Sequence, residues 1–152
     1  MKKIYKTQQE VEKDIKNGVL AIEGDVKFEC SISISASIIV TYGNINAGNI
    51  TAGNITAGNI NAWNINAGNI TAGNITAGNI TAWDINARDI LYSAFCCVYQ
   101  NIKCLSIKAK RTPSKEPICL EGKLEIKEPE QNSAEKEAME LLKSKGFKII
   151  KE

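Results

Sequence analysis

The stretch NINAGNITAGNITAGNINAW, residues 44–63, is followed directly by NINAGNITAGNITAGNITAW, residues 64–83. The two copies differ at one place, where Asn61 of the first corresponds to Thr81 of the second. Within each copy a five-residue unit, Gly-Asn-Ile-Thr-Ala or Gly-Asn-Ile-Asn-Ala, recurs almost without change. Internal repetition of fixed length is typical of solenoids and other repeat architectures, so this stretch decides the fold.

The isoleucines set the shortest period. They occur at every fifth position of this region, at 45, 50, 55, 60, 65, 70, 75, 80, 85 and 90. A period of five is neither the 3.6 of a helix nor the 2 of a flat strand, and it fits a chain that turns a corner every five residues. The longer repeat then indicates four pentads per coil, with Trp63 directly below Trp83. A three-sided coil of three pentads would separate the two tryptophans and would place Thr51 below Asn66.

The regular small residue is the alanine two positions after each isoleucine. We expect isoleucine and alanine to point into the coil, the threonine or asparagine between them to point outward, and Gly-Asn to form the corner, where both tolerate left-handed dihedrals. Stacked coils lie about 4.8 Å apart, a spacing at which asparagine side chains form hydrogen-bonded ladders. Carboxylates would repel one another there. In the pentads acids appear late, at Asp84 and Asp89, and each is expected above an asparagine.

The triplet Asn49-Ile50-Thr51 and its equivalents match the middle of a known pattern: a small residue, Asp or Asn, Leu or Phe, then Ser, Thr or Arg, then a variable residue. Residues 43–92 therefore resemble the pentapeptide-repeat proteins, whose chains wind into right-handed, four-sided parallel β-helices. This chain departs from the family two positions before the central apolar residue. The family has its small inward residue at this position. This chain has glycine at most of the equivalent positions, but it has Trp63, Trp83 and Arg88 at others. The resemblance implies a fold and leaves the function open.

These patterns predict a mainly β protein: a short right-handed quadrilateral β-solenoid of four pentads per coil, with non-repetitive caps. Residues 1–30 are expected to form an N-terminal cap of strands and a short helix over 7–16. Residues 31–110 are expected to form the solenoid. Residues 111–152 are expected to form a strand pair, a linker and an amphipathic C-terminal helix over about 134–145. Caps are required because open solenoid ends expose unpaired backbone and invite polymerisation.

Bulk properties narrow the classes of function. The chain has 152 residues, a formal net charge of +2 and no histidine. The small charge by itself implies neither a nucleic-acid nor a membrane partner. The lack of histidine removes the commonest general base and metal ligand. No apolar run follows the basic N-terminus, and no stretch reaches the roughly 18 apolar residues of a membrane span, so a soluble protein is expected.

The cysteines form neither a disulfide framework nor a zinc motif. Their number is odd, which favours a reduced, cytoplasmic protein. The last four of them lack the paired C-x₂-C spacing of zinc sites, so buried, apolar thiols are expected and no metal or cofactor is predicted. The cysteines are Cys30, Cys96, Cys97, Cys104 and Cys119.

The main candidate site comprises Trp63, Trp83, Asp84 and Arg88. Two stacked tryptophans are too large for the interior of so narrow a coil, so we expect them on the surface. Exposed tryptophan and arginine are enriched at binding hot spots. Two alternatives stay open: the C-terminal helix covers the tryptophans, or they form a self-association surface.

A basic run provides a weaker candidate site, for nucleic acid. Its side chains could contact phosphates, although a solvated strand edge that resists aggregation is the simpler explanation. The run comprises Lys103, Lys108, Lys110, Arg111 and Lys115.

The function predicted from these features is macromolecule binding without catalysis. No combination of nucleophile, base and orienting group is apparent, so an enzyme is not expected. A rigid solenoid surface would bind and block a protein partner, and the small size and simple repeat suit an inhibitor from a phage or another mobile element. Mimicry of DNA is disfavoured because the repeat is uncharged. The alternatives are a self-assembling scaffold, such as a homodimer formed through an end cap or the C-terminal helix, and nucleic-acid binding through residues 103–115. No membrane partner is expected.

Overall fold

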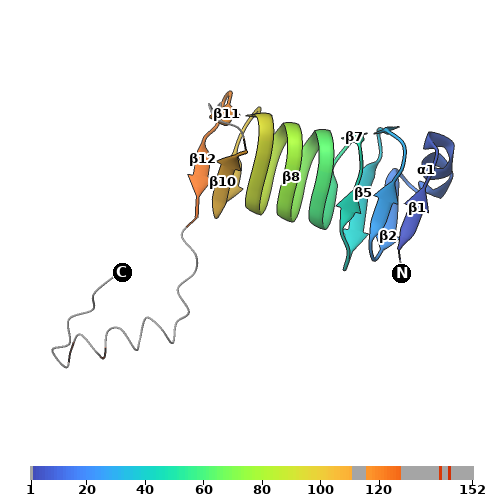
Figure 1. Cartoon of the computed structure of the whole chain (residues 1–152), viewed down its shortest axis with the longest axis horizontal. Helices are drawn as coiled ribbons and strands as arrows, with labels where there is room; N and C mark the ends of the chain where they lie inside the picture. Colours follow the sequence, from blue (N-terminus) through green and yellow to red (C-terminus); the bar gives the residue numbers. More distant parts are fainter. Residues whose placement is uncertain (1, 111–115, 128–140, 142–143, 145–152) are drawn as a thin grey trace.

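A computed structural model describes residues 2–110 and 116–127, together with Leu141 and Ser144. The described chain is a parallel β-solenoid of about six turns, with its coils stacked along one long axis (Figure 1). The prediction of a mainly β solenoid is therefore confirmed. None of the helices in the described part of the chain has the length and apolar character that a membrane span requires. The predicted C-terminal helix falls outside the described residues, except for Leu141 and Ser144, which are helical.

Short strands and one helix form the N-terminal coils. They are β1 (Lys3–Tyr5), α1 (Gln8–Asp14), β2 (Val19–Glu23), β3 (Val26–Phe28), β4 (Ile32–Ser33), β5 (Ser37–Thr41), β6 (Ile45–Asn46) and β7 (Asn49–Ala52). The pentads then continue as one long strand that winds through successive coils, β8 (Ile55–Val98). The C-terminal coils contain β9 (Ile102–Cys104), β10 (Ser106–Ala109), β11 (Ile118–Cys119) and β12 (Leu124–Ile126).

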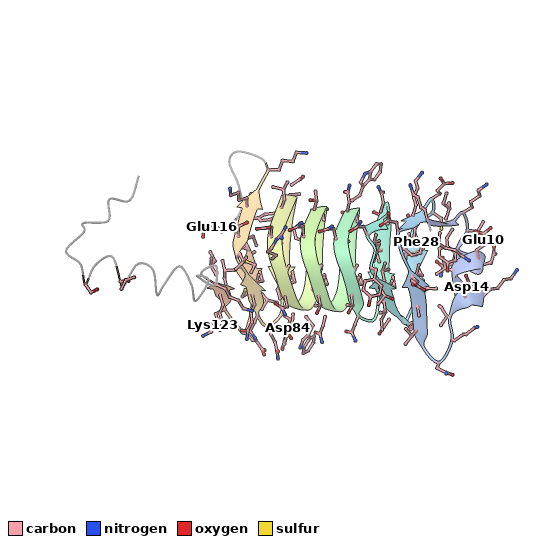
Figure 2. The ribbon with its side chains drawn as sticks, turned by 90° about the horizontal axis from the view of Figure 1, so that it is seen from below. Glu10, Asp14, Phe28, Asp84, Glu116 and Lys123 are labelled. Atoms are coloured by element: carbon pink, nitrogen blue, oxygen red, sulfur yellow. The ribbon has the colours of Figure 1, made fainter. Side chains whose placement is uncertain are left out.

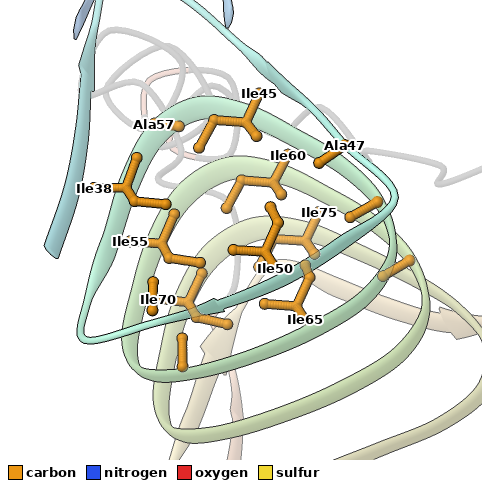
Figure 3. Close-up of a cluster of buried hydrophobic side chains, with 14 of the residues drawn as sticks. Ile38, Ile45, Ala47, Ile50, Ile55, Ala57, Ile60, Ile65, Ile70 and Ile75 are labelled. Carbon is orange, nitrogen blue, oxygen red and sulfur yellow. The ribbon is translucent and has the colours of Figure 1, made fainter. Parts of the chain in front are cut away.

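Each coil of the pentad region contains three pentads and has three sides. Ile50 on β7 lies beside Ile65 on β8, and Thr51 lies beside Asn66. Hydrogen bonds between asparagines repeat this separation of 15 positions. Figure 3 shows the three-sided outline, with the isoleucines in three separate columns. The predicted four-sided coil is thus wrong for the pentads.

The size of the side chains in the interior explains why the coil has three sides. Each side contributes one isoleucine and one alanine, and the isoleucines of the three sides meet at the centre (Figure 3). A fourth side would widen the interior without supplying larger side chains. An unfilled interior is destabilising because the atoms that line it lose their packing contacts. The repeat of four pentads in the sequence therefore does not correspond to the length of a coil.

The coils at both ends are longer than those of the pentads. Hydrogen-bonded partners lie 18 or 19 positions apart toward the N-terminus. Toward the C-terminus they lie 17 or 22 positions apart. The expected spacing of four pentads is thus approached in the end coils, where the pentad pattern is lost.

The orientation of the side chains is as predicted. The pentad isoleucines from Ile45 to Ile90 are almost fully buried, and their alanines are buried too, except for the half-buried Ala72. The threonines and asparagines between them are exposed. These isoleucines and alanines make up most of the buried core. Burial of each isoleucine contributes roughly 2–3 kcal/mol to the stability of the fold.

The helix α1 closes the N-terminal end. Thr7 Oγ1 accepts a hydrogen bond from the backbone N–H of Glu10 at 3.3 Å, as the capping spacing predicts. The Gln8 side chain donates to the Ser33 carbonyl at 2.7 Å and accepts from the Ser33 N–H at 3.1 Å. It thereby replaces the neighbouring strand that β4 lacks on this edge. Val11 is fully buried against the end of the core.

A second contact fixes α1 to the first strand. The Tyr5 hydroxyl donates to the Asp14 carboxylate at 2.8 Å, and Lys3 Nζ lies 3.0 Å from the same carboxylate. These contacts, the tyrosine hydrogen bond first, lower the pKa of the Asp14 carboxyl. The helix ends at Asp14, two residues before the predicted end. A turn with positive φ at Asn17 and Gly18 then leads into β2.

Candidate functional site

Columns of polar side chains run along the corners of the solenoid. In the first column, the Asn44 backbone N–H and side-chain amide both donate to Asp25 Oδ1 at 2.9 Å. Asn59 Nδ2 donates to Asn44 Oδ1 at 2.7 Å, and the Asn74 N–H donates to Asn59 Oδ1 at 3.1 Å. The predicted asparagine ladder is therefore present, with a step of three pentads instead of four.

The second column consists of Ser31, Asn49, Asn64 and Asn79. Asn64 Nδ2 donates to Asn49 Oδ1 at 2.6 Å, and Asn79 Nδ2 donates to Asn64 Oδ1 at the same distance. At every step the residue of the later coil donates to the residue of the earlier coil. An aspartate cannot donate, so it fits where a column begins or passes into an end coil, as Asp25 does.

The third column passes from Asn54 and Asn69 into the C-terminal coils. The Asn69 N–H donates to Asn54 Oδ1 at 2.8 Å, and the Asn101 N–H donates to Asp84 Oδ1 at 3.0 Å. The Lys123 N–H then donates to Asn101 Oδ1 at 3.2 Å. The column therefore ties the regular coils to the C-terminal coils.

Changing Asn64 to aspartate tests the ladders. We expect Asn64→Asp to lower the free energy of unfolding by about 1–2 kcal/mol, because it removes a donor and brings a carboxylate close to Asn49 Oδ1. The measurement is chemical denaturation at neutral pH. Asn66→Asp is the matched control, since Asn66 is exposed on the side of the coil. Equal losses for the two variants would contradict a stabilising ladder.

The two tryptophans do not share a column. The Trp63 N–H donates to the Gly48 carbonyl at 2.7 Å, and Gly78 packs against the Trp63 carbonyl, so Trp63 lies between two glycines. The Trp83 carbonyl instead accepts from the Gln100 N–H at 2.9 Å. The predicted stack of Trp63 and Trp83 is wrong because each coil consists of three pentads. Both side chains nevertheless point outward, with exposed fractions of 76% and 50%.

The tryptophans border the same side of the solenoid. Trp63 directly precedes the segment 64–67 of this side, and Trp83 directly follows the segment 79–82 one coil later. We call this side, with both corners, the tryptophan-flanked face. Between the two corners its outward side chains are uncharged, and they are Thr51, Asn66, Thr81, Cys97 and Ile118. Carboxylates occur at the Trp83 corner, where Asp84 follows Trp83 and a Glu121 carboxylate oxygen accepts a hydrogen bond from the Tyr99 hydroxyl at 2.6 Å.

The other two sides carry charges toward their ends. One has Lys27 beside Asn46 and Lys108 beside Leu91. The other has Lys103, whose Nζ lies 3.5 Å from a Glu125 carboxylate oxygen. The side chains labelled in Figure 2 illustrate the same distribution, with Glu10 and Asp14 at the N-terminal end and Glu116 and Lys123 at the C-terminal end. From Cys30 to Trp83 the sequence contains no charged residue.

One corner of the tryptophan-flanked face carries a cluster of large exposed apolar and aromatic side chains. The Trp83 and Tyr99 rings stack with their centroids 4.4 Å apart and their planes at 29°. The Leu120 N–H donates to the Val98 carbonyl, which places the exposed Leu120 beside Tyr99. Ile118, half exposed, lies beside Cys97. Sequence reasoning missed Tyr99, Ile118 and Leu120, because coils of irregular length separate them from the pentads.

Asp84 and Arg88 belong to different corners. Asp84 adjoins Trp83 and accepts the hydrogen bond from Asn101 described above. Arg88 lies at the next corner, where Nη2 donates to Asn74 Oδ1 at 3.3 Å and Nε lies 3.1 Å from Asp89. The structure thus brings Trp83 and Asp84 together and separates Arg88 and Trp63 from them.

The predicted basic run is divided between two sides. Lys103 lies on β9 and contacts Glu125, whereas Lys108 lies on β10 of the adjoining side. Lys110 is exposed just after β10. Arg111 and Lys115 fall outside the described residues. No continuous stripe of free cations is formed by Lys103, Lys108 and Lys110.

Two of the five cysteines are fully buried in the core, and Cys30, Cys97 and Cys119 are half-buried. Cys96 and Cys104 are buried, and burial raises the pKa of the Cys96 thiol to about 12. Such a thiol does not ionise at neutral pH. In the described part of the chain, no three side chains of histidine, cysteine, aspartate or glutamate are grouped so that they could hold a metal ion.

Comparisons of this chain with protein-family models, with curated proteins and with solved structures find no match. The parallel β-solenoid of this chain is consistent with the parallel β-helix that its pentads predicted. Its three-sided coils differ from the four-sided ones of the pentapeptide-repeat proteins.

Proposed function

We propose that this protein is a binding module without catalytic activity, which docks a protein partner on the tryptophan-flanked face and thereby blocks it. We also regard its pentads as a three-sided variant of the pentapeptide repeat. The observation that carries the proposal is the position of Trp63 and Trp83, which are both exposed and border one uncharged side.

The face has the composition of an interaction surface. Isolated exposed apolar residues are ordinary, but adjacent ones indicate a contact site. Trp83, Tyr99, Leu120 and Ile118 are such neighbours. Tryptophan and tyrosine are enriched in the central part of interfaces, whereas charged residues are depleted there. The hydrogen-bonded ladders along its corners would hold the face in place and so reduce the entropy lost on binding.

The size of the face limits the mode of docking. One side spans five residues, or roughly 15 Å, and six coils at about 4.8 Å each are roughly 30 Å high. The flat area is therefore about 450 Å², compared with about 800 Å² per partner in a standard interface. A partner must therefore extend over at least one tryptophan corner to bind stably.

Nucleic acid is a poorer candidate for the partner. Binding to phosphates requires several free cations along one surface. Lys103 contacts Glu125, and Lys108 points from a different side. A protein surface that is mainly apolar and neutral fits the tryptophan-flanked face better.

The proposal is tested by capturing a partner on the immobilised protein and then measuring its affinity with purified components. We expect the Trp63→Ala/Trp83→Ala variant to bind at least ~30-fold more weakly, because hot-spot residues contribute about 2 kcal/mol or more. Tyr42→Ala is the matched control, since Tyr42 is a highly exposed aromatic residue away from this face.

Each variant must retain the circular dichroism spectrum and melting temperature of the wild type, which its exposed position favours. Unchanged affinity of the double tryptophan variant would refute the proposal. Binding that weakens steeply with salt and depends on Lys103 and Lys108 would point to nucleic acid instead.

A further inference from the structure

The C-terminal end of the solenoid core is open among the described residues. Ile102 is completely buried, but Leu124, next in the same inward column, is 37% exposed. In the neighbouring column Cys104 is 1% exposed and Ile126 is 59% exposed. Leu124 and Ile126 therefore have the orientation of core residues without a coil above them.

The adjoining side is open at the same level. Ile90 and Tyr92 are buried, whereas Ile107 and Ala109, their neighbours on β10, are only partly buried. Apolar side chains on two sides of the last coil thus form one surface, which we call the open end.

The N-terminal end shows how this chain closes a core. There α1 contributes the fully buried Val11, and Gln8 satisfies the free backbone of β4. A short amphipathic helix is thus sufficient to cover a coil of this width. The described residues provide no equivalent at the C-terminal end.

We infer that the amphipathic segment 134–145 of the same chain docks on the open end and completes the core. Ala134, Ala138, Leu141 and Leu142 would lie along one face of a helix, because their spacings are close to multiples of 3.6. Leu141 is helical and 57% exposed, so it too is an apolar side chain without cover.

The position of Lys127 supports the segment 134–145 as the occupant of the open end. The Lys127 N–H donates to the Cys104 carbonyl at 2.7 Å, which holds the last described residue before 128 at the rim of the open end. The six residues 128–133 can span about 20 Å, more than the roughly 15 Å width of one side. A tethered segment also has an effective concentration of about millimolar, which favours it over a second copy of the chain.

The test compares thermal unfolding of the full chain with that of two variants. Leu141→Glu places a charge on the apolar face of the segment, and we expect the melting midpoint to fall by about 3–6 °C. Lys143→Gln makes the same change in net charge on the opposite face, and its midpoint should remain within about 1 °C of the wild type. Equal midpoints for wild type and Leu141→Glu would overturn the inference.

Two further measurements identify the occupant. In hydrogen exchange, the amides of 138–145 should exchange at least ~10-fold more slowly in wild type than in Leu141→Glu. The losses for Leu141→Ala and Ile126→Ala should not add in the double variant, because contacting residues are coupled. Additive losses would overturn the contact. A dimer in light scattering that dissociates on Leu141→Glu would assign the open end to a second copy and would also overturn it.

Discussion

A disulfide is expected to form between positions 51 and 66, but not between positions 51 and 71. Thr51 and Asn66 are neighbours on adjacent coils of the tryptophan-flanked face. Strands that pair lie about 4.8 Å apart, within the Cα separation of roughly 4.4–6.8 Å that disulfides allow. Thr71, four pentads from Thr51, lies on another side together with Asn86 and Lys103.

The experiment uses Thr51→Cys/Asn66→Cys and Thr51→Cys/Thr71→Cys under mild oxidation. Peptide mass spectrometry separates the new cross-links from any that involve the five native cysteines. The first variant should cross-link nearly completely, and closing a loop of about 15 residues should then add up to about 3 kcal/mol of stability. The second variant is the control, and its cross-linking in place of the first would restore the four-sided coil.

Gly43→Ala is expected to destabilise the protein by about 2–4 kcal/mol. A Cβ at this buried position would overlap the backbone of Gly24 and Asp25 in the preceding coil. These atoms cannot move away without breaking the stacking of β3 on β6, because backbone does not rotate like a flexible side chain. Chemical denaturation measures the loss.

Gly48→Ala is the matched control, because a Cβ there meets no atom within 4 Å. The same exchange at Gly48 should leave stability unchanged or raise it slightly, since alanine lowers the entropy of the unfolded chain. A comparable loss in both variants would show that the close approach of Gly43 and Gly24 is unimportant for stability.

The inward and outward positions of the pentads could be predicted from the sequence because they depend on local spacing. Ile65, Asn66 and Ala67 behave as expected, and so does the ladder through Asn64. The number of sides could not be predicted in this way. Whole pentads are interchangeable, so every corner and ladder is satisfied equally by three or four pentads per coil. The filling of the interior decides between them, and it depends on the three sides together.

Irregular coil lengths explain the remaining differences. An unbroken period of five would place Phe95 in an isoleucine column, but Phe95 is exposed and its neighbour Cys96 is fully buried. The Tyr99 N–H donates to the Ala82 carbonyl 17 positions earlier, and Ile85 pairs with Ile102 at the same separation, so this coil is longer than the 15-residue coils of the pentads. The extra length places Tyr99 against Trp83 and creates the apolar corner. The longer coil therefore creates a part of the candidate site that periodicity does not reveal.

The sequence repeat contains four pentads, whereas the coil contains three. This difference determines the result when further copies of the repeat lengthen the solenoid. Four pentads make one and one-third turns of a coil that holds three, so each duplicated segment arrives rotated by a third of the circumference. Trp63 and Trp83 already occupy two successive corners, and a tryptophan from one more copy would occupy the third. Further duplication would thus place a tryptophan at each corner in turn along the solenoid axis. A longer protein would then present its binding surfaces in new directions.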